Sequence, residues 1–244
     1  MHGQQFTFRP ACEADLDAMA ALARSIRQSL PNPNMFEADD RAFYAAALKN
    51  QGSILLALAR PKHGGRETIA GASVILFPDA YDPENLGFDL NFDRRQRSLV
   101  RQLDSVFLDP AYRGCGLSAQ LMRKNMERTA RPDRPYDMAT IWPGNLPSLR
   151  LFFSLGLTLR ALKLKYGGKP RFIALGGDGL ILRTRGSMEI SAWDMGMANE
   201  LFSGGYAGTA ARLDEITGEM LIRCQQADHP AKAAGSLTQH ADTI

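Results

Sequence analysis

A glycine-containing turn between an apolar strand and an amphipathic helix constrains this chain more than any other segment. The strand-like residues 103–108 stop at Pro110, the turn passes through Gly114 and Gly116, and an apolar stripe at helical spacing begins at Leu117. Glycines let backbone N–H groups approach a ligand, and a helix N-terminus adds unpaired donors and partial positive charge. The segment therefore predicts either an anion-binding corner or an ordinary strand–turn–helix connection.

Strand-like and helix-like segments alternate along most of the chain. Apolar runs predict strands at 6–10, 53–60, 69–77, 103–108, 136–142, 157–164 and 171–175, and helical spacing predicts helices at 13–30, 39–49, 117–130 and 147–155. Residues 61–65 are expected to form a hairpin turn. Residues 79–99 are expected to form a functional loop or a short helical excursion that either covers the acceptor site or only wraps the sheet. This order predicts an α/β sandwich whose core ends near residue 185.

Composition excludes several classes of protein. A chain of 244 residues with 45% hydrophobic residues needs no disulfide framework. The three cysteines form no C-x-x-C pair and the four histidines are scattered, so we expect no metal site. No apolar run approaches the roughly 20 residues of a membrane span, and no signal-peptide core opens the chain. We therefore expect a cytoplasmic protein without a membrane partner.

Charge is unevenly distributed. The net charge is +3, but residues 186–244 carry three basic and eight acidic side chains, which leaves +8 for residues 1–185. A basic body suits an anionic small ligand. The basic residues are not interleaved with aromatic residues in a recognition pattern, so we expect no nucleic-acid partner.

Two segments resemble motifs of the GNAT superfamily of N-acetyltransferases. The acyl-CoA pyrophosphate loop of that superfamily reads Gln/Arg-x-x-Gly-x-Gly/Ala, which Arg113 and Gly116 match while Ser118 replaces the last residue. The next motif reads Asn-x-x-Ala/Ser-x-x-x-Tyr/Phe-x-x-x-Gly-Phe, which residues 145–157 resemble from Asn145 to Gly156. The two motifs have the expected order and separation, and the resemblance covers roughly residues 5–180.

The resemblance implies a fold and a cofactor site. The fold is a three-layer α/β/α sandwich with a mixed central sheet, splayed into a V between strands 103–108 and 136–142. It occupies residues 1–185, and residues 186–244 form a C-terminal extension. Acetyl-CoA is the implied cosubstrate and lies in the V, with no metal. The implied cofactor-binding residues are Val106, Phe107 and Leu108 for pantetheine, Arg113, Gly114, Cys115, Gly116, Leu117 and Ser118 for pyrophosphate, and Asn145 and Phe152 in the second motif.

Asp104 is the candidate general base. Strand alternation places Asp104, Val106 and Leu108 on one face and the intervening residues on the other, unless a bulge intervenes. A carboxylate here resembles the strand-borne base of many superfamily members, and burial would raise its pKa to a useful value. The alternative is a solvated or hydrogen-bonded aspartate with no catalytic role.

The general acid is harder to assign. Many superfamily members have Tyr where this chain has Phe152, and a phenyl ring cannot donate a proton. Tyr166, in a glycine-containing turn, either reaches the site as the acid or packs locally, and a third alternative is that the thiolate leaves unprotonated. Cys115 is expected to be a tolerated small residue rather than an acyl-carrying nucleophile.

The resemblance implies an N-acetyltransferase that transfers the acetyl group by direct attack of a primary amine in a ternary complex. The favoured acceptor is a small-molecule amine, and a protein amine comes second. The alternative from another class is an acyl-CoA-binding sensor with degenerate catalysis, because Phe152 replaces the usual tyrosine. In the extension we expect a strand at 187–193 and a helix at 210–225, which could dock on the body or mediate a homodimer.

Overall fold

The computed structural model describes residues 5–50, 52–60 and 67–228, without the side chains of residues 184 and 185, so the turn predicted at 61–65 lies outside the described residues. By its internal contacts the chain divides into two units. Unit 1 comprises residues 1–85 and 94–134, and unit 2 comprises residues 86–93 and 135–244. The domain boundary predicted at residue 185 falls inside unit 2 and stays a proposal.

Unit 1 is an antiparallel sheet in the order β1-β2-β3-β4 with helices on both faces. Its elements are β1 (Phe6–Pro10), α1 (Leu16–Ser29), α2 (Arg41–Lys49), β2 (Ser53–Ala59), β3 (Thr68–Leu76), α3 (Arg94–Ser98), β4 (Val100–Leu108) and α4 (Leu117–Arg128). The segment predicted as a loop or short helical excursion at 79–99 holds α3 and a 3-10 helix at Leu86–Leu90, so the helical alternative is confirmed.

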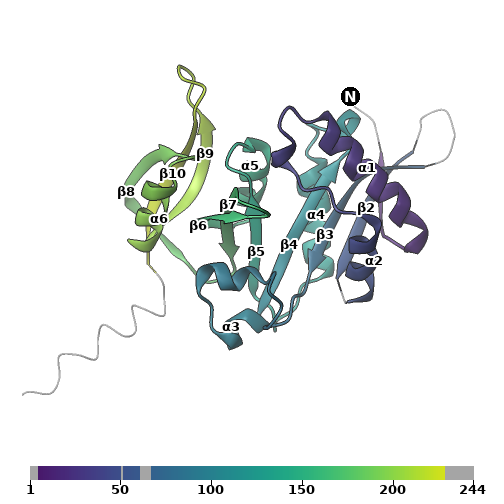
Figure 1. Ribbon diagram of the computed structural model, residues 1–244, viewed down its shortest axis with the longest axis horizontal. Coiled ribbons are helices and arrows are strands. Elements are labelled where there is room, and N and C mark those ends of the chain that lie inside the picture. The colour runs from purple at the N-terminus through teal and green to yellow at the C-terminus, as the bar shows by residue number, and fades with distance from the viewer. Residues whose placement is uncertain (1–4, 51, 61–66, 229–244) are drawn as a thin grey trace, which may run out of the picture. The chain divides into compact units, whose positions relative to one another are not determined.

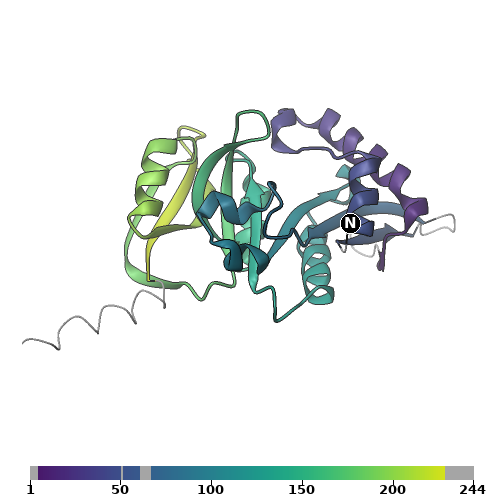
Figure 2. The ribbon, with the colours of Figure 1, turned by 60° about the horizontal axis from the view of Figure 1, so that its bottom comes forward.

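The helices of unit 1 cover opposite faces of its sheet. Figures 1 and 2 show α1 and α2 together on one face and α4 on the other. The α1/α2 face buries Met19, Tyr44 and Phe107, whereas Leu108 and Leu121 are buried on the α4 face. The α1 stripe predicted from helical spacing is buried along its whole length, because those side chains fill the first of these cores.

Buried polar groups fix α4 against the sheet. The Asn125 side chain, fully buried, donates to the backbone oxygen of Ser73 at 3.0 Å and accepts from the Ser53 hydroxyl at 2.6 Å. Arg101 on β4 donates to the Met126 carbonyl oxygen near the end of α4 at 2.9 Å. Because leaving such groups unpaired in the core is costly, these bonds hold α4 in one position under β2, β3 and β4. The loop that precedes α4 is thereby fixed at one end.

Unit 2 contains antiparallel strands in the order β5-β7-β6-β9-β10-β8. Its elements are β5 (Tyr136–Ile141), α5 (Leu146–Ser154), β6 (Thr158–Lys165), β7 (Lys169–Gly176), β8 (Ile181–Ser191), α6 (Met195–Ser203), β9 (Tyr206–Leu213) and β10 (Met220–Asp228). The segment at 86–93 packs on these strands, where the Lys165 ammonium lies 2.9 Å from the Asp89 carboxylate. α6 is attached through Asn199, whose side chain bonds both the N–H and the C=O of Leu162 at 2.9 Å.

The prediction of a helix at 210–225 is wrong. These residues form most of the antiparallel β9–β10 hairpin, and the preceding helix α6 was not predicted. Met220, Ile222 and Cys224 are buried at every second position, which is the strand period, whereas Ile216, which would lie on the apolar face of such a helix, is 95% exposed. Asp214 turns the hairpin by accepting hydrogen bonds from the Ile216 and Thr217 N–H groups. The strand expected at 187–193 is present as the second half of β8.

Candidate active site

The glycine-containing turn has the geometry of an anion site. β4 ends at Leu108, a 3-10 turn follows at Pro110–Tyr112, and Gly114 and Gly116 adopt φ values of +78° and +79° before α4 begins. Gly116 is the residue that precedes α4 and offers no side chain to cap it, so the first-turn N–H groups lack a side-chain partner. These donors, with the partial positive charge of the helix terminus, can bind phosphate oxygens.

The side chains of the turn leave its backbone accessible. Arg113 and Cys115 are exposed and Ser118 is half-buried. The Cys115 thiol donates to the Tyr112 carbonyl oxygen at 3.2 Å, which turns its sulfur toward its own loop. Leu117 is only 2% exposed and packs with Leu108 and Leu121. Leu117 is thus an anchor, while its neighbours present backbone donors and one arginine.

β4 carries a bulge at Asp104 that changes which side chains share a face. The register pairs Ile75 with Leu103 and Val74 with Ser105, so Asp104 has no partner on β3. Opposed residues in an antiparallel pair share a face, so Ser105 lies with Val74 on the α1/α2 face. Asp104 interacts electrostatically with Asp39 and Tyr44 on that same face. A bulge was the exception allowed for in the predicted alternation, and because it is present Asp104 does not share a face with Val106 and Leu108.

The residues predicted to pair with pantetheine lie just after this bulge. Phe107 is buried against Phe36 and Tyr44, with ring centroids 5.7 and 6.3 Å apart, and Val106 and Leu108 pack on the opposite face. A Cβ at Gly71 would lie 2.5 Å from the Phe107 carbonyl oxygen, so only glycine permits the close approach of β3. This end of β4 is therefore rigidly held.

Asp39, Tyr44 and Asp104 form what we call the acid cluster. Both carboxylates are half-buried, and Tyr44 is fully buried. Within the described part of the chain its hydroxyl has no hydrogen-bond partner, and neither carboxylate has an ion-pair partner. The cluster thus holds uncompensated acidic groups beside an orphaned donor, an arrangement that costs stability unless a ligand completes it.

The pKa values of the two carboxyls follow from this environment. Desolvation, followed by repulsion from Asp39, raises the pKa of Asp104 to about 7. Desolvation and then repulsion from Asp40 and Glu37 raise the pKa of Asp39 to about 6. Desolvation and the nearby carboxylates raise the pKa of Tyr44 above its ordinary value, so its hydroxyl keeps its proton. A carboxyl that titrates near neutral pH can accept a proton from an amine during catalysis.

Sequence reasoning missed Asp39 and Tyr44. Asp39 lies just before α2, where Asp40 caps the helix by accepting from the Phe43 N–H at 2.9 Å, and Tyr44 lies on the buried face of α2. Neither position belongs to a motif or stands out by local pattern. Their role emerges only when α2 packs on β4, so no local signal could have found them.

The remaining predicted site residues belong to unit 2. Asn145 caps α5, its side-chain oxygen accepting from the Ser148 N–H at 3.1 Å, and Phe152 is buried at 4% exposure. Tyr166 adopts a positive φ of 49° in the β6–β7 turn, and its hydroxyl lies 3.1 Å from the Thr140 hydroxyl. The Arg171 guanidinium covers its ring. Asp104 and the glycine turn thus both belong to unit 1, while the roles of the three unit 2 residues stay predictions.

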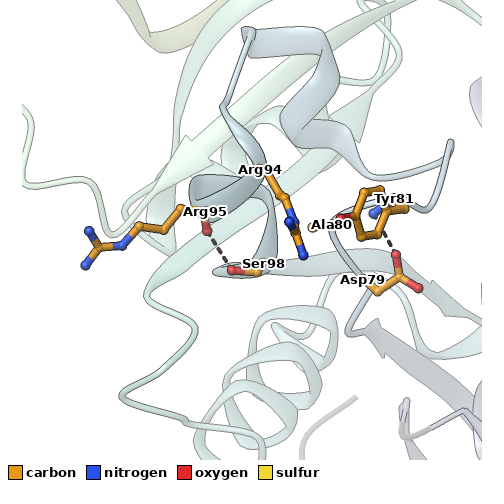
Figure 3. Close-up of a pocket in the computed structure, with 6 residues that line it drawn as sticks. All are labelled: Asp79, Ala80, Tyr81, Arg94, Arg95 and Ser98. Atoms are coloured by element: carbon orange, nitrogen blue, oxygen red, sulfur yellow. Dashed lines mark hydrogen bonds between the residues drawn. The ribbon is translucent and has the colours of Figure 1, made fainter.

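An open cavity of about 620 Å³ lies in unit 1 beside α3 (Figure 3). Figure 3 shows the Arg94 side chain directed toward Tyr81, whereas Arg95 points away, and the Arg94 guanidinium lies 4.9 Å from the Tyr81 ring centroid. Asp79 accepts from the Tyr81 N–H at 2.6 Å and thereby fixes the turn. Tyr81 is 66% exposed, so this cavity is a shallow surface feature.

Among the described residues, no three metal-ligating side chains of the His, Cys, Asp or Glu type lie close enough together to hold an ion. Within the same residues, no helix is long and apolar enough to cross a membrane.

Comparison with known proteins identifies the fold of the chain but assigns it to no sequence family. No protein-family model matches the sequence, and no curated protein matches it. Among solved structures, yncA from Salmonella typhimurium, solved with its cofactor acetyl-CoA, gives a TM-score of 0.50 at 21% identity over 70% of this chain and 91% of its own. The NatC complex bound to Gag peptide and CoA gives 0.53 at 14% identity over 71% and 98%.

A third solved structure is diaminobutyrate acetyltransferase from Paenibacillus lautus, in complex with L-2,4-diaminobutyric acid and coenzyme A. It gives a TM-score of 0.50 at 12% identity over 72% of this chain and 96% of its own. These likenesses, all below 25% identity, show the fold: the chain has the α/β fold of the GNAT N-acetyltransferases, as the resemblance predicts. The matches span nearly all of each solved chain and under three quarters of this one, which is consistent with an added C-terminal region.

Proposed function

We propose that this protein is an acyl-CoA-dependent N-acyltransferase that transfers an acetyl group from acetyl-CoA to a primary amine of a small molecule. The observation that carries the proposal is the turn after β4, where Gly114 and Gly116 adopt positive φ and open α4 without a side-chain cap. That geometry suits a pyrophosphate, and it stands on a fold shared with N-acetyltransferases.

Acetyl-CoA would supply the thioester, and residues of this chain would hold it. We assign pyrophosphate binding to residues 113–118 and pantetheine binding to the end of β4 at Val106, Phe107 and Leu108. The resemblance adds Asn145 and Phe152 as cofactor-binding residues. Arg113 is exposed and can pair with a phosphate, while the backbone N–H donors of the turn set the position of that phosphate. The acyltransferase domain would span residues 1–185 of a cytoplasmic enzyme without a metal, and residues 186–244 would form the extension, with docking or homodimerisation as its role.

The proposed reaction is direct attack by the amine nitrogen on the thioester carbonyl carbon. The new C–N bond forms as the C–S bond breaks, Asp104 accepts the proton that the amine loses, and coenzyme A leaves as a thiolate. Asp104 can act as a base at neutral pH because its carboxyl has a pKa of about 7. The thiolate takes its proton from water or from Tyr166, whose hydroxyl bonds Thr140. Holding the two reactants together supplies much of the rate.

The alternative is an acyl-CoA-binding sensor with degenerate catalysis. It is favoured by Phe152, a buried residue without a hydroxyl where many superfamily members have tyrosine. A sensor would need the phosphate turn but no base, so the raised pKa of Asp104 supports the enzyme.

Release of free thiol from acetyl-CoA in the presence of an amine panel tests the proposal. The panel contains amino acids, polyamines, amino sugars and a peptide with a free N-terminus. We expect thiol release that requires a small amine and is lost in Asp104→Asn, which should still bind acetyl-CoA by calorimetry. Thiol release with the peptide alone would move the acceptor to a protein amine. Binding of acetyl-CoA with no thiol release from any amine would establish the sensor.

A further inference from the structure

A second cavity, of about 560 Å³, lies in unit 1 between α1 and the residues that lead into α2. Side chains from one stripe of α1 form its first wall, because positions 17, 20, 24 and 27 recur at helical spacing. The second wall is the segment 38–42. The cavity is lined by Asp17, Ala20, Arg24, Arg27, Ala38, Asp39, Asp40, Arg41 and Ala42.

The arginines that line this cavity differ in whether they are paired. Arg41 lies 3.2 Å from the Asp17 carboxylate and 3.4 Å from that of Glu13, and Arg27 lies 3.9 Å from Glu37. Arg24 is exposed and, among the residues described, makes no ion pair. It is therefore the cation of this cavity that is available to a ligand, and an arginine suits a carboxylate because its donors form a planar fork.

Asp39 connects the cavity to the acid cluster. It lines the cavity and also interacts electrostatically with Asp104 and Tyr44, and its carboxylate has no cationic partner among the described side chains. The Tyr44 hydroxyl beside it is fully buried and unpartnered. An orphaned buried donor with two unpaired carboxylates indicates a missing ligand, and the ligand that compensates two carboxylates is a cation.

We propose that the acceptor is an aliphatic amine that also carries a carboxylate, with its amine at the acid cluster and its carboxylate on Arg24. The inference rests on the proposed function, since the amine is placed beside Asp104. A simple diamine would set its second ammonium against Arg24, and a monoamine would leave Arg24 unused. The cavity therefore distinguishes amino acids with an amine-bearing side chain from the corresponding diamines.

Matched pairs of acceptors test this proposal directly. L-2,4-Diaminobutyric acid, L-ornithine and L-lysine each differ from 1,3-diaminopropane, putrescine and cadaverine, respectively, only by a carboxylate. The test is to determine kcat/KM for each of these six acceptors at saturating acetyl-CoA. In at least one pair the amino acid should be preferred by about tenfold or more, the effect expected of one charge-assisted hydrogen-bonded pair. The three chain lengths ensure that the spacing between the two groups is sampled.

Arg24→Gln should reduce that preference to near unity, because it removes the positive charge while keeping a polar side chain at this position. Arg60→Gln is the matched control, since Arg60 is exposed and pairs with Glu67 outside the cavity. It should keep the wild-type preference. Equal turnover of both members of every pair, preference for the diamine, or an undiminished preference in Arg24→Gln would each overturn the proposal.

Failure of the proposed function gives a different pattern. If no amine causes thiol release, transfer is excluded, and calorimetric binding of lysine and cadaverine then tests the cavity by itself. Tighter binding of lysine that Arg24→Gln abolishes supports the amino-carboxylate site, whereas equal or absent binding overturns it. Melting temperatures of both variants within about 2 °C of wild type show that the fold is intact, as expected for exposed positions.

Discussion

The glycine turn at 113–118 and the acid cluster of Asp39, Tyr44 and Asp104 are both built around β4, yet they use opposite physical means. The turn exposes backbone N–H groups and keeps its side chains small or solvated. The cluster packs acidic side chains against a buried tyrosine on the α1/α2 face of the sheet. Binding by the turn should therefore depend on backbone conformation, whereas the chemistry of the cluster should depend on individual side chains.

Asp104→Asn should have the largest effect on the reaction. Removing a general base typically lowers the rate by about 10²–10⁴-fold, and Asn keeps the shape of the residue without accepting the proton. We expect kcat to fall by at least about 100-fold while the affinity for acetyl-CoA changes by less than about threefold, because the turn is untouched. Steady-state kinetics with calorimetry checks both values, and an unchanged kcat would remove Asp104 from the mechanism.

Gly116→Val tests the backbone side of the comparison. Nothing lies within 4 Å of a Cβ at this position, so any effect comes from the φ of +79° and not from crowding. A β-branched residue in this conformation costs about 1–2 kcal/mol, which should appear as roughly tenfold weaker acetyl-CoA binding or as lower stability. Gly116→Asn is the control, because asparagine tolerates the left-handed region. Equal effects of Val and Asn would refute a conformational requirement.

The cluster should make stability depend on pH even without substrate. Unfolded aspartates titrate near 3.8, whereas Asp39 and Asp104 titrate near 6 and 7 in the folded chain. Between these values the folded state binds more protons, so stability should fall as the pH rises from about 4 to 7. For half-buried carboxyls we expect a loss on the order of 1–2 kcal/mol. Urea unfolding at pH 4 and pH 7 measures it, and a loss of the same size in Asp104→Asn would show that another group is responsible.

Asp39→Asn should shift a pH profile. Repulsion from Asp39 contributes to the raised pKa of Asp104, so removing that charge should lower the acid-side pKa in kcat/KM below about 7. Asp228→Asn is the control, since its side chain is 46% exposed and pairs with Arg183 on β8, outside the acceptor cavity. Its profile should match wild type. A profile unmoved by Asp39→Asn would mean that the two carboxylates do not interact.

Cys115→Ala should have the smallest effect. The thiol makes only a weak 3.2 Å hydrogen bond to the Tyr112 carbonyl oxygen, and the turn uses its backbone. We expect kcat and the affinity for acetyl-CoA to change by less than about twofold, close to the usual effect of a surface substitution. Loss of turnover with affinity retained would instead identify Cys115 as a covalent nucleophile.

The glycine turn could be predicted from the sequence, whereas the acid cluster could not. The strand, turn and α4 are consecutive in the chain, so local spacing located them and the resemblance gave the fold. The face of Asp104 could not be decided from the sequence, because the bulge depends on the register with β3. Asp39 and Tyr44 reach Asp104 only through the packing of α2, which no local pattern encodes. In the extension, apolar residues around 213–221 fit both periods, and only their burial identified the β9–β10 hairpin.

Calorimetric titration of the protein with acetyl-CoA tests the central claim most directly. The account predicts saturable binding at one site per chain, weakened by Gly116→Val and unaffected by Cys115→Ala. The absence of binding at high ligand concentration would mean that the turn after β4 is only a structural connection. The acyltransferase proposal would then be wrong despite the shared fold.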